Sequence, residues 1–351
     1  MSKRVLFHDN QIGERGTTQS ILDYARSIQA YGHDVALSYN VNSKGNNPDF
    51  IQVVKQEFKV LGYENDNELL SIGADFDAVY FQKAGHIDGK SVGAVHTVVH
   101  SVFQNFEPHG NYYGYISPWL ARRMRNFVHR PREIFRGSIK TGKLARVSGC
   151  ENALAFDHIS LICEMPTATE NLRAELGIPD EAFVILRYGG FDTFDIPFVH
   201  SLIPQLLDAN PNWYFVGVNT QEFSQHPRVI YHPKILDKQI KANVLASADV
   251  FLNARLSGES FGLANAEALQ LGLPVLAWSS GPEQNHVEML KNLGGLYKNE
   301  KELSRKLDLI AQGIPIAQRS ELLAEGAKYR MGEIAPKLAK ALKVRSIGGV
   351  D

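Results

Sequence analysis

Short apolar runs alternate with segments of helical periodicity along most of the chain. Strand-like runs lie at 4–9, 33–40, 77–82, 93–100, 112–117, 183–190, 213–218, 229–232, 248–254 and 274–279. Helical patterns lie at 17–32, 197–209, 237–247 and 262–271. Strands without strict in–out alternation are typical of parallel sheets covered by helices on both faces. The pattern therefore predicts an α/β fold, and it occurs twice.

The two occurrences predict two doubly wound, Rossmann-like domains. The segment "CEMPTATENLRAELGIPDEA" (163–182) has prolines at both ends and indicates the transition between them. We expect a first domain at 1–165, a second at 166–330 and a C-terminal helix at 331–351. Pro336 interrupts the helical pattern of 319–344, which predicts a kink or two segments. A ligand is expected in the cleft between the domains, beyond the carboxyl ends of the strands.

Composition narrows the class of protein without identifying a partner. Hydrophobic residues at 44% and charged residues at 21% are typical of a globular protein, and a net charge of −1 selects no polyanion. Cys150 and Cys163 are the only cysteines, too few for a disulfide framework. No apolar run approaches the roughly 18 residues of a membrane span. We therefore expect a cytoplasmic protein with reduced thiols.

One carboxylate contradicts its surroundings. Glu267 lies in a helical segment, 262–272, that is apolar on almost every side, and unpaired carboxylates are rarely buried. The segment follows a predicted strand and a glycine-containing loop, so its first amides can hold a phosphate. Glu267 lies about 7 Å farther along the axis, where a carboxylate can accept from both ribose hydroxyls. Glu259 precedes the helix, on the side of a nucleotide's sugar substituent.

A simpler interpretation of both glutamates remains open. Glu267 can pair with a lysine or arginine from another element, and Glu259 can be a capping residue.

The stretch "ESFGLANAE", followed by "ALQLGLPVLAW", resembles the E-x7-E signature of retaining glycosyltransferases of family 4, which have the GT-B fold. The resemblance is strong from about 180 to 280 and weaker in the first half. It implies that Glu267 binds the donor ribose and that Glu259 contacts the donor sugar. It also implies a C-terminal helix that crosses back to the first domain. The residues whose amides would hold the pyrophosphate are Ser260, Phe261, Gly262 and Leu263.

The chain departs from this family after the first strand of the second domain. The family's arginine falls at Phe191, and its lysine falls near Phe194 or Asp195, in "LRYGGFDTFDIPF". A leaving diphosphate needs a stabilising charge, and the nearest candidates in sequence are Arg187 and Arg255. Each of these arginines can instead be an ordinary ion-pair residue. The glycine-rich stretch here is expected to line the donor or acceptor pocket through Gly189 and Gly190.

In the first domain the resemblance implies donor and acceptor contacts after the first strand. Gly16 and Thr17 match the loop against the donor phosphates, and Thr18 lies on its acceptor side, although Thr17 can equally be a plain N-cap. His100 matches a histidine near the donor sugar, but a strand-end histidine can also satisfy a buried carbonyl. The earlier His96 is expected to be structural. Ser117 is placed near the acceptor.

The segment 122–146 holds nine lysines and arginines against one acid, Glu133. It begins with Arg122 and Arg123, on the domain that would carry the acceptor. Such runs are often solvated surface, but this one also fits an anionic acceptor: a glycan, a lipid surface or a nucleic acid.

These patterns predict a glycosyltransferase that moves a sugar from a nucleotide diphosphate sugar to a hydroxyl acceptor, with retention implied by the resemblance. No D-x-D pair lies near the site, so neither a metal nor another cofactor is expected. Three alternatives stay open: a sugar-nucleotide epimerase, a sugar phosphorylase, and a non-catalytic nucleotide-binding or interaction module. The missing arginine and lysine favour the last of these.

Overall fold

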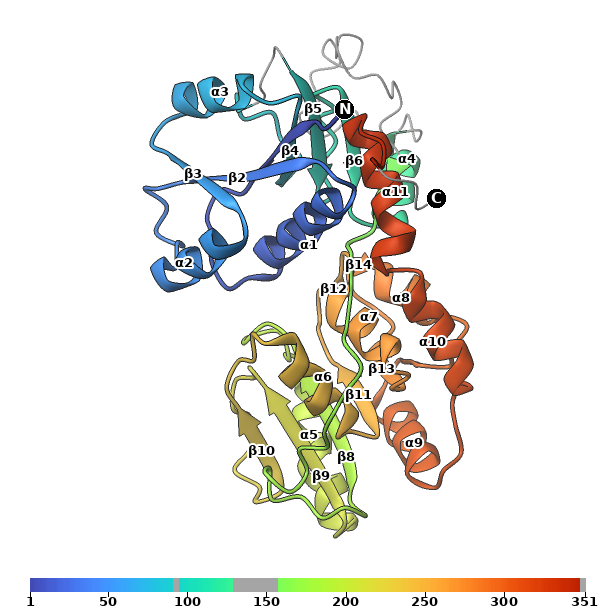
Figure 1. The fold of residues 1–351 in the computed structure, drawn as a ribbon. Coiled ribbons are helices and arrows are strands. Elements are labelled where there is room, and N and C mark those ends of the chain that lie inside the picture. Colours follow the sequence, from blue (N-terminus) through green and yellow to red (C-terminus); the bar gives the residue numbers. More distant parts are fainter. Residues whose placement is uncertain (91–94, 129–156, 348–351) are drawn as a thin grey trace. The chain divides into compact units, whose positions relative to one another are not determined.

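The computed structural model describes residues 1–90, 95–128 and 157–347, which form two compact units (Figure 1). Unit 1 comprises Met1–Ile162 and Met331–Asp351, and unit 2 comprises Cys163–Arg330. The chain thus leaves unit 1 three residues before the expected boundary at 165. It re-enters unit 1 at Met331, so the C-terminal helix belongs to the first unit.

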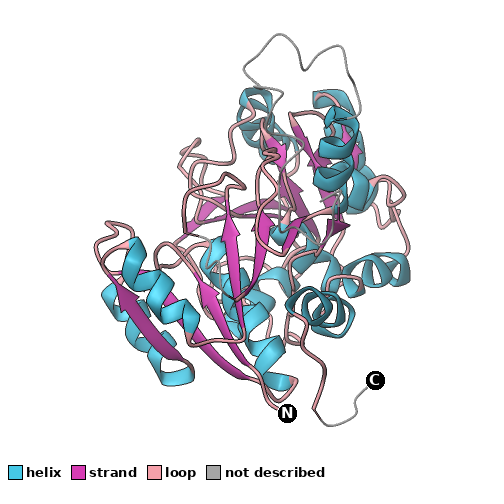
Figure 2. Cartoon of the chain, turned by 90° about the horizontal axis from the view of Figure 1, so that it is seen from above, coloured by secondary structure: helices cyan, strands magenta, loops and turns pink. Residues whose placement is uncertain are grey.

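Unit 1 is built on a parallel sheet with the strand order β3-β2-β1-β4-β5-β6-β7. The strands are β1 (Arg4–His8), β2 (Asp34–Asn40), β3 (Lys59–Tyr63), β4 (Ala78–Lys83), β5 (His96–Ser101), β6 (Tyr112–Tyr115) and β7 (Asp157–His158). Its helices are α1 (Gly16–Ala30), α2 (Pro48–Glu57), α3 (Asp66–Ala74), α4 (Pro118–Val128) and α11 (Met331–Leu342). Helices flank the strands of both units (Figure 2).

The segment between β2 and β4 was not predicted from the sequence pattern. There α2 and α3 begin at Asn47 and Asn65, whose side chains accept hydrogen bonds from first-turn amides. The intervening β3 is a short strand at the sheet edge. Its Tyr63 is buried against Leu6 and Phe81 in the core of unit 1, which fixes an element whose own pattern is weak.

Unit 2 repeats the architecture with the parallel order β10-β9-β8-β11-β13-β15. Its strands are β8 (Phe183–Tyr188), β9 (Trp213–Val218), β10 (Val229–His232), β11 (Val250–Asn253), β13 (Val275–Trp278) and β15 (Leu296–Tyr297), with β12 (Gly258–Glu259) paired to β14 (Glu283–Gln284). Its helices are α5 (Pro197–Ala209), α6 (Lys238–Ala246), α7 (Leu263–Gln270), α8 (Asn285–Leu290), α9 (Glu300–Ala311) and α10 (Arg319–Ala327). Both units are therefore doubly wound, as predicted.

The C-terminal helical stretch divides into two helices, but not at the proline. The break lies between Ala327 and Met331, whereas Pro336 lies inside α11. The ring removes one backbone donor in the second turn without ending the helix. Packing of α11 on α1 and β5 holds it in unit 1, and His96 Nε2 lies 2.7 Å from the carbonyl oxygen of Ala341. The structural role expected for His96 is thereby confirmed.

Part of the basic segment, residues 129–146, lies outside the described residues, and so does Cys150. Cys163 is buried. Among the described residues, no helix has both the length and the apolar character needed to cross a membrane.

Candidate functional site

The strand order of unit 2 reverses between β8 and β11, and ligands of open α/β sheets bind beyond the carboxyl ends of such a pair. The two loops that leave these strands are bonded to each other. The Asp195 amide donates to the Ala254 carbonyl at 3.0 Å, and Asp195 Oδ1 accepts from the Leu256 amide at 2.7 Å. Asp195 therefore holds the loop after β11.

Glu259 lies in that loop with its carboxylate half-buried. Its Oε2 is 2.8 Å from Arg255 Nη1, and its Oε1 accepts from Asn253 Nδ2 at 3.2 Å. Residue 258 must be a glycine, because its φ is +70° and a Cβ there would meet the Glu283 carbonyl oxygen at 1.9 Å. The capping role considered for Glu259 is wrong, since the N-cap of α7 is Gly262 and no side chain caps that end.

The side chain of His286 fixes the backbone of Glu259 through a hydrogen bond. Its Nδ1 accepts from the Glu259 amide at 3.2 Å, so its Nε2 donates to the Trp278 carbonyl, 2.6 Å away. Both bonds require the neutral ring, and burial lowers the pKa of His286 accordingly. This residue and Asn253 were not singled out in the sequence, although Asn253 lies in the predicted strand 248–254.

The N-terminus of α7 begins at a left-handed glycine, Gly262, with φ +93°. Beside it, Asn265 is fully buried, and its Nδ2 has no hydrogen-bond partner among the described residues. The Phe261 side chain is buried edge-on against Tyr329. The backbone carbonyl of Phe261 accepts from Asn285 Nδ2 at 2.7 Å. Phe261 can therefore serve a ligand only through its amide. The amides of Ser260 and Leu263 belong to the same helix end, where unpaired donors favour anions.

Glu267 is 5% exposed and forms an ion pair with Lys241 of α6, with Nζ and Oε1 2.8 Å apart. This confirms the simpler interpretation as far as a basic partner is concerned; binding of ribose remains a prediction. Only one carboxylate oxygen is used, because no other hydrogen bond to Glu267 occurs within the described residues. Lys241 also lies over the Tyr188 ring, 4.7 Å from its centroid. Neither Lys241 nor Tyr188 was marked in the sequence.

Arg187 is buried, and both of its Nη atoms donate hydrogen bonds to neighbouring protein groups. Its guanidinium donates to four groups within 3.0 Å: the carbonyls of Gly190 and Asn219 and the hydroxyls of Thr193 and Thr220. Burial lowers the pKa of Arg187 to about 10, opposed by the nearby Glu259 charge. A role of Arg187 toward the leaving diphosphate remains a prediction. Arg187 instead ties together the loops that follow β8 and β9.

The glycine-rich loop after β8 is shaped by those bonds. The Gly189 carbonyl accepts from Asn219 Nδ2 at 2.7 Å, and the Gly190 carbonyl accepts from Arg187. Phe191, where the family has arginine, is 59% exposed. The pocket-lining role expected for the two glycines remains a prediction.

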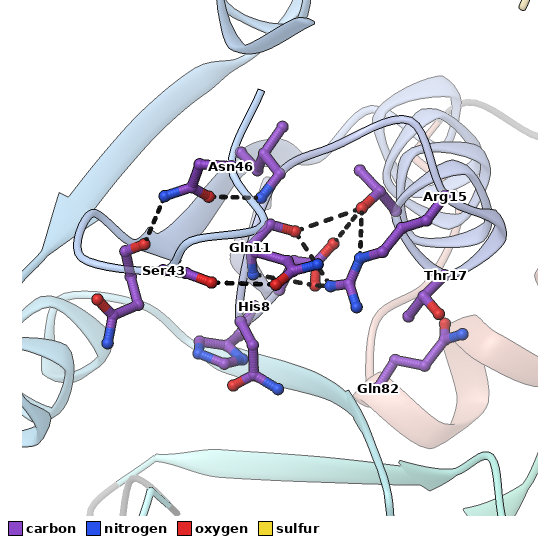
Figure 3. Close-up of polar contacts among 12 residues, drawn as sticks. His8, Gln11, Arg15, Thr17, Ser43, Asn46 and Gln82 are labelled. Atoms are coloured by element: carbon purple, nitrogen blue, oxygen red, sulfur yellow. Dashed lines mark hydrogen bonds and ion pairs between the residues drawn. The ribbon is translucent and has the colours of Figure 1, made fainter. Parts of the chain in front are cut away.

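In unit 1 the corresponding reversal lies between β1 and β4. In the loop after β1, the Arg15 guanidinium donates to the Gln11 carbonyl at 3.1 Å (Figure 3). The buried Asp9 carboxylate pairs with Arg15 and accepts from Thr18 Oγ1 at 2.6 Å. Thr18 is fully buried, and its expected acceptor role remains a prediction. Gly16 is exposed and Thr17 is partly exposed at the start of α1, so their donor contacts remain predictions.

Two further candidates in unit 1, His100 and Ser117, have fully buried side chains, and their roles toward donor and acceptor remain predictions. His100 Nδ1 lies 2.6 Å from the Tyr80 hydroxyl, near the carboxyl end of β5. Ser117 Oγ accepts from the Leu120 amide at 3.2 Å and thereby caps α4. Arg123 on the same helix is exposed and Arg122 partly exposed, so an acceptor role for these arginines remains a prediction.

Comparison with known proteins places the chain among glycosyltransferase structures. Residues 184–310 match the family model described as glycosyl transferases group 1. Anabaena HepE, solved with UDP and glucose, is similar over 97% of this chain and 99% of its own, with 15% identity and a TM-score of 0.69. A Rickettsia africae glycosyltransferase is similar over 97% and 98%, with 12% identity and a TM-score of 0.64.

Sucrose-phosphate synthase of Thermosynechococcus elongatus is similar over 97% and 98% of the two chains, with 14% identity and a TM-score of 0.58. A search of curated protein sequences finds no match. At these identities the likeness shows the fold: the chain has two parallel-sheet α/β units of the GT-B type.

Proposed function

We propose that the chain is a glycosyltransferase that moves a sugar from a nucleotide diphosphate sugar to a hydroxyl acceptor. The observation that carries this proposal is the family match over 184–310. That segment contains Glu259, the N-terminus of α7 and Glu267, all beyond the reversal of the unit 2 sheet. Because Anabaena HepE was solved with UDP and with UDP-glucose, UDP is the first nucleotide to test.

In the proposed site the α7 amides hold the diphosphate, Glu267 accepts from the ribose hydroxyls, and Glu259 contacts the transferred sugar. Arg255 takes the role of the cation. Its side chain is 33% exposed, and its pair with Glu259 is of the partly exposed kind that contributes about 1 kcal/mol or less. A diphosphate can therefore recruit Arg255 and stabilise the leaving charge.

The resemblance to family 4 supports retention of anomeric configuration. The bond from the anomeric carbon to the diphosphate breaks, and the acceptor oxygen attacks the oxocarbenium-like centre from the same face. Catalysis then rests on positioning and on the charge around the diphosphate. We further propose that no metal is required and that the protein works in the cytoplasm, on an acceptor of anionic character.

A specific observation favours a second candidate, a non-catalytic nucleotide-binding module. The family's arginine position holds the exposed Phe191, and Arg187 is engaged by backbone and hydroxyl groups. A module of this kind binds nucleotide without turnover.

The discriminating experiment incubates the protein with UDP-, GDP- and ADP-sugars, with and without glycan, lipid and nucleic-acid acceptors, and follows diphosphate release. Acceptor-dependent release that persists in EDTA supports a metal-independent transferase. Binding without turnover across the panel supports the module. Isomerisation or hydrolysis of donor without any acceptor supports the epimerase.

A further inference from the structure

The ion pair between Lys241 and Glu267 joins two helices that are 26 residues apart in sequence. Both side chains are almost fully buried, with 10% of the lysine and 6% of the glutamate exposed. Removing one partner from such a pair leaves an uncompensated charge, which strongly destabilises a protein. The chain therefore maintains the pair at a place where two apolar residues would also pack.

Lys241 is fixed from a second side by Tyr188, the last residue of β8. An ammonium 4.7 Å from a ring centroid gains a cation–π attraction. Burial alone would lower the pKa of Lys241, but the charge of Glu267 outweighs it, so the pKa is raised and the ammonium persists. Lys241 thus presents a fixed positive charge to Glu267.

The carboxylate of Glu267 is only half used. Oε1 accepts from Lys241, whereas Oε2 accepts no hydrogen bond from any described residue. An ionised carboxylate has about four lone-pair positions, so acceptor capacity is left over. Residue 267 also lies four residues, about 6 Å, beyond residue 263 on the same helix face, in line with the amides at the start of α7.

We propose that Lys241 is a positioning residue for nucleotide recognition: it holds the carboxylate of Glu267 in one rotamer through Oε1, which leaves Oε2 to accept from the ribose hydroxyls. The proposal rests on the proposed function, because it assigns a further residue to the same donor site. It makes the site selective for ribose over 2′-deoxyribose, since a buried acceptor left without its donor is unfavourable.

The test measures calorimetric affinities for UDP and 2′-deoxy-UDP. For the wild type we expect UDP to bind roughly 10–100-fold more tightly, the value of one charge-assisted hydrogen bond. In Lys241→Met the ratio should fall below about threefold, because the carboxylate of Glu267 loses the hydrogen bond that fixes its rotamer and no longer presents Oε2 in one place. Lys241→Arg should restore most of the ratio. Glu267→Gln should lose it, and the double variant Lys241→Met, Glu267→Gln should lose no more.

Lys291→Met is the matched control. Lys291 also belongs to unit 2 and pairs with a glutamate, Glu288 at 3.2 Å, but on the surface, with 57% of its side chain exposed. The ratio of UDP affinity to 2′-deoxy-UDP affinity in Lys291→Met should equal that of the wild type. Because the ratio compares two ligands on the same folded molecules, partial unfolding of Lys241→Met does not imitate the expected result.

Three outcomes overturn different statements. An unchanged ratio in Lys241→Met overturns the role of Lys241. Equal binding of UDP and 2′-deoxy-UDP by the wild type overturns the ribose contact, while the proposed transferase stands. Failure of the wild type to bind UDP, GDP or ADP overturns the proposed function and the present inference together.

Discussion

Asp9 in unit 1 and Glu267 in unit 2 are both buried carboxylates beside the strand reversal of a doubly wound sheet, but their partners differ. Asp9 accepts from Arg15, Thr18 and the Gln11 amide, through both of its oxygens. Glu267 accepts from Lys241 alone, through one oxygen. A carboxylate with both oxygens engaged by its own chain stabilises a loop, whereas one with an oxygen to spare can serve a ligand. Equal topology therefore does not imply equal function.

The largest effect on stability is expected from removing the carboxylate of Asp9, both of whose oxygens accept hydrogen bonds. Asp9→Ala removes the acceptor of the Gln11 amide, the buried Thr18 hydroxyl and Arg15, so the free energy of unfolding should fall by about 3–5 kcal/mol, about 1–1.5 kcal/mol for each bond. Urea denaturation measures it. Asp208→Ala, which removes a carboxylate with 76% of its side chain exposed, should stay within about 1 kcal/mol of the wild type. A comparably small change in the free energy of unfolding of Asp9→Ala would contradict the view that Asp9 stabilises the loop after β1.

Acid should destabilise the molecule through its buried histidines. Burial lowers the pKa of His8 to about 3 and that of His100 to about 4. Below about pH 6.5 these histidines bind protons in the unfolded chain but stay neutral in the native protein. The free energy of unfolding therefore falls by about 1.4 kcal/mol for each unit by which the pH is lowered, for each ring. Asp9, whose pKa is raised by burial, acts in the opposite sense near the acid end.

Denaturation at pH 6.5, 5.5 and 4.5 gives this slope. In His100→Gln it should decrease by about 1.4 kcal/mol per pH unit, because one titrating ring is gone. His86→Gln, which replaces an exposed histidine, should leave the slope as it is. The reverse pattern would contradict the assignment of the acid sensitivity to buried rings.

The carboxylate of Glu267, unlike that of Asp9, should contribute to ligand binding as well as to stability. Glu267→Gln keeps an oxygen for Lys241 but loses the charge, so UDP affinity should fall by about 1.5–3 kcal/mol. Calorimetry measures it, with Glu288→Gln, a change in a surface pair, as the control. If UDP affinity is unaffected while stability drops, Glu267 resembles Asp9 and the distinction between the units fails.

The smallest effect is expected from Arg187→Lys. A lysine cannot reproduce four bonds made by a planar guanidinium, so unit 2 should lose about 1–2 kcal/mol of stability. If Arg187 acts only by holding loops, KM for the donor should rise more than kcat falls. A loss confined to kcat would instead restore Arg187 as a catalytic cation.

The repeated alternation of strands and helices, the E-x7-E spacing and Gly258 were readable in the sequence, because local periodicity and backbone conformation fix them. The sequence also showed that Glu267 needs an explanation. It could not supply Lys241, since the partner of a buried charge is chosen by the packing of helices distant in sequence. The same applies to His100 and Ser117, whose residue types suit a ligand or a buried bond equally well. For Arg187 only the folded loops decide that its donors are already taken.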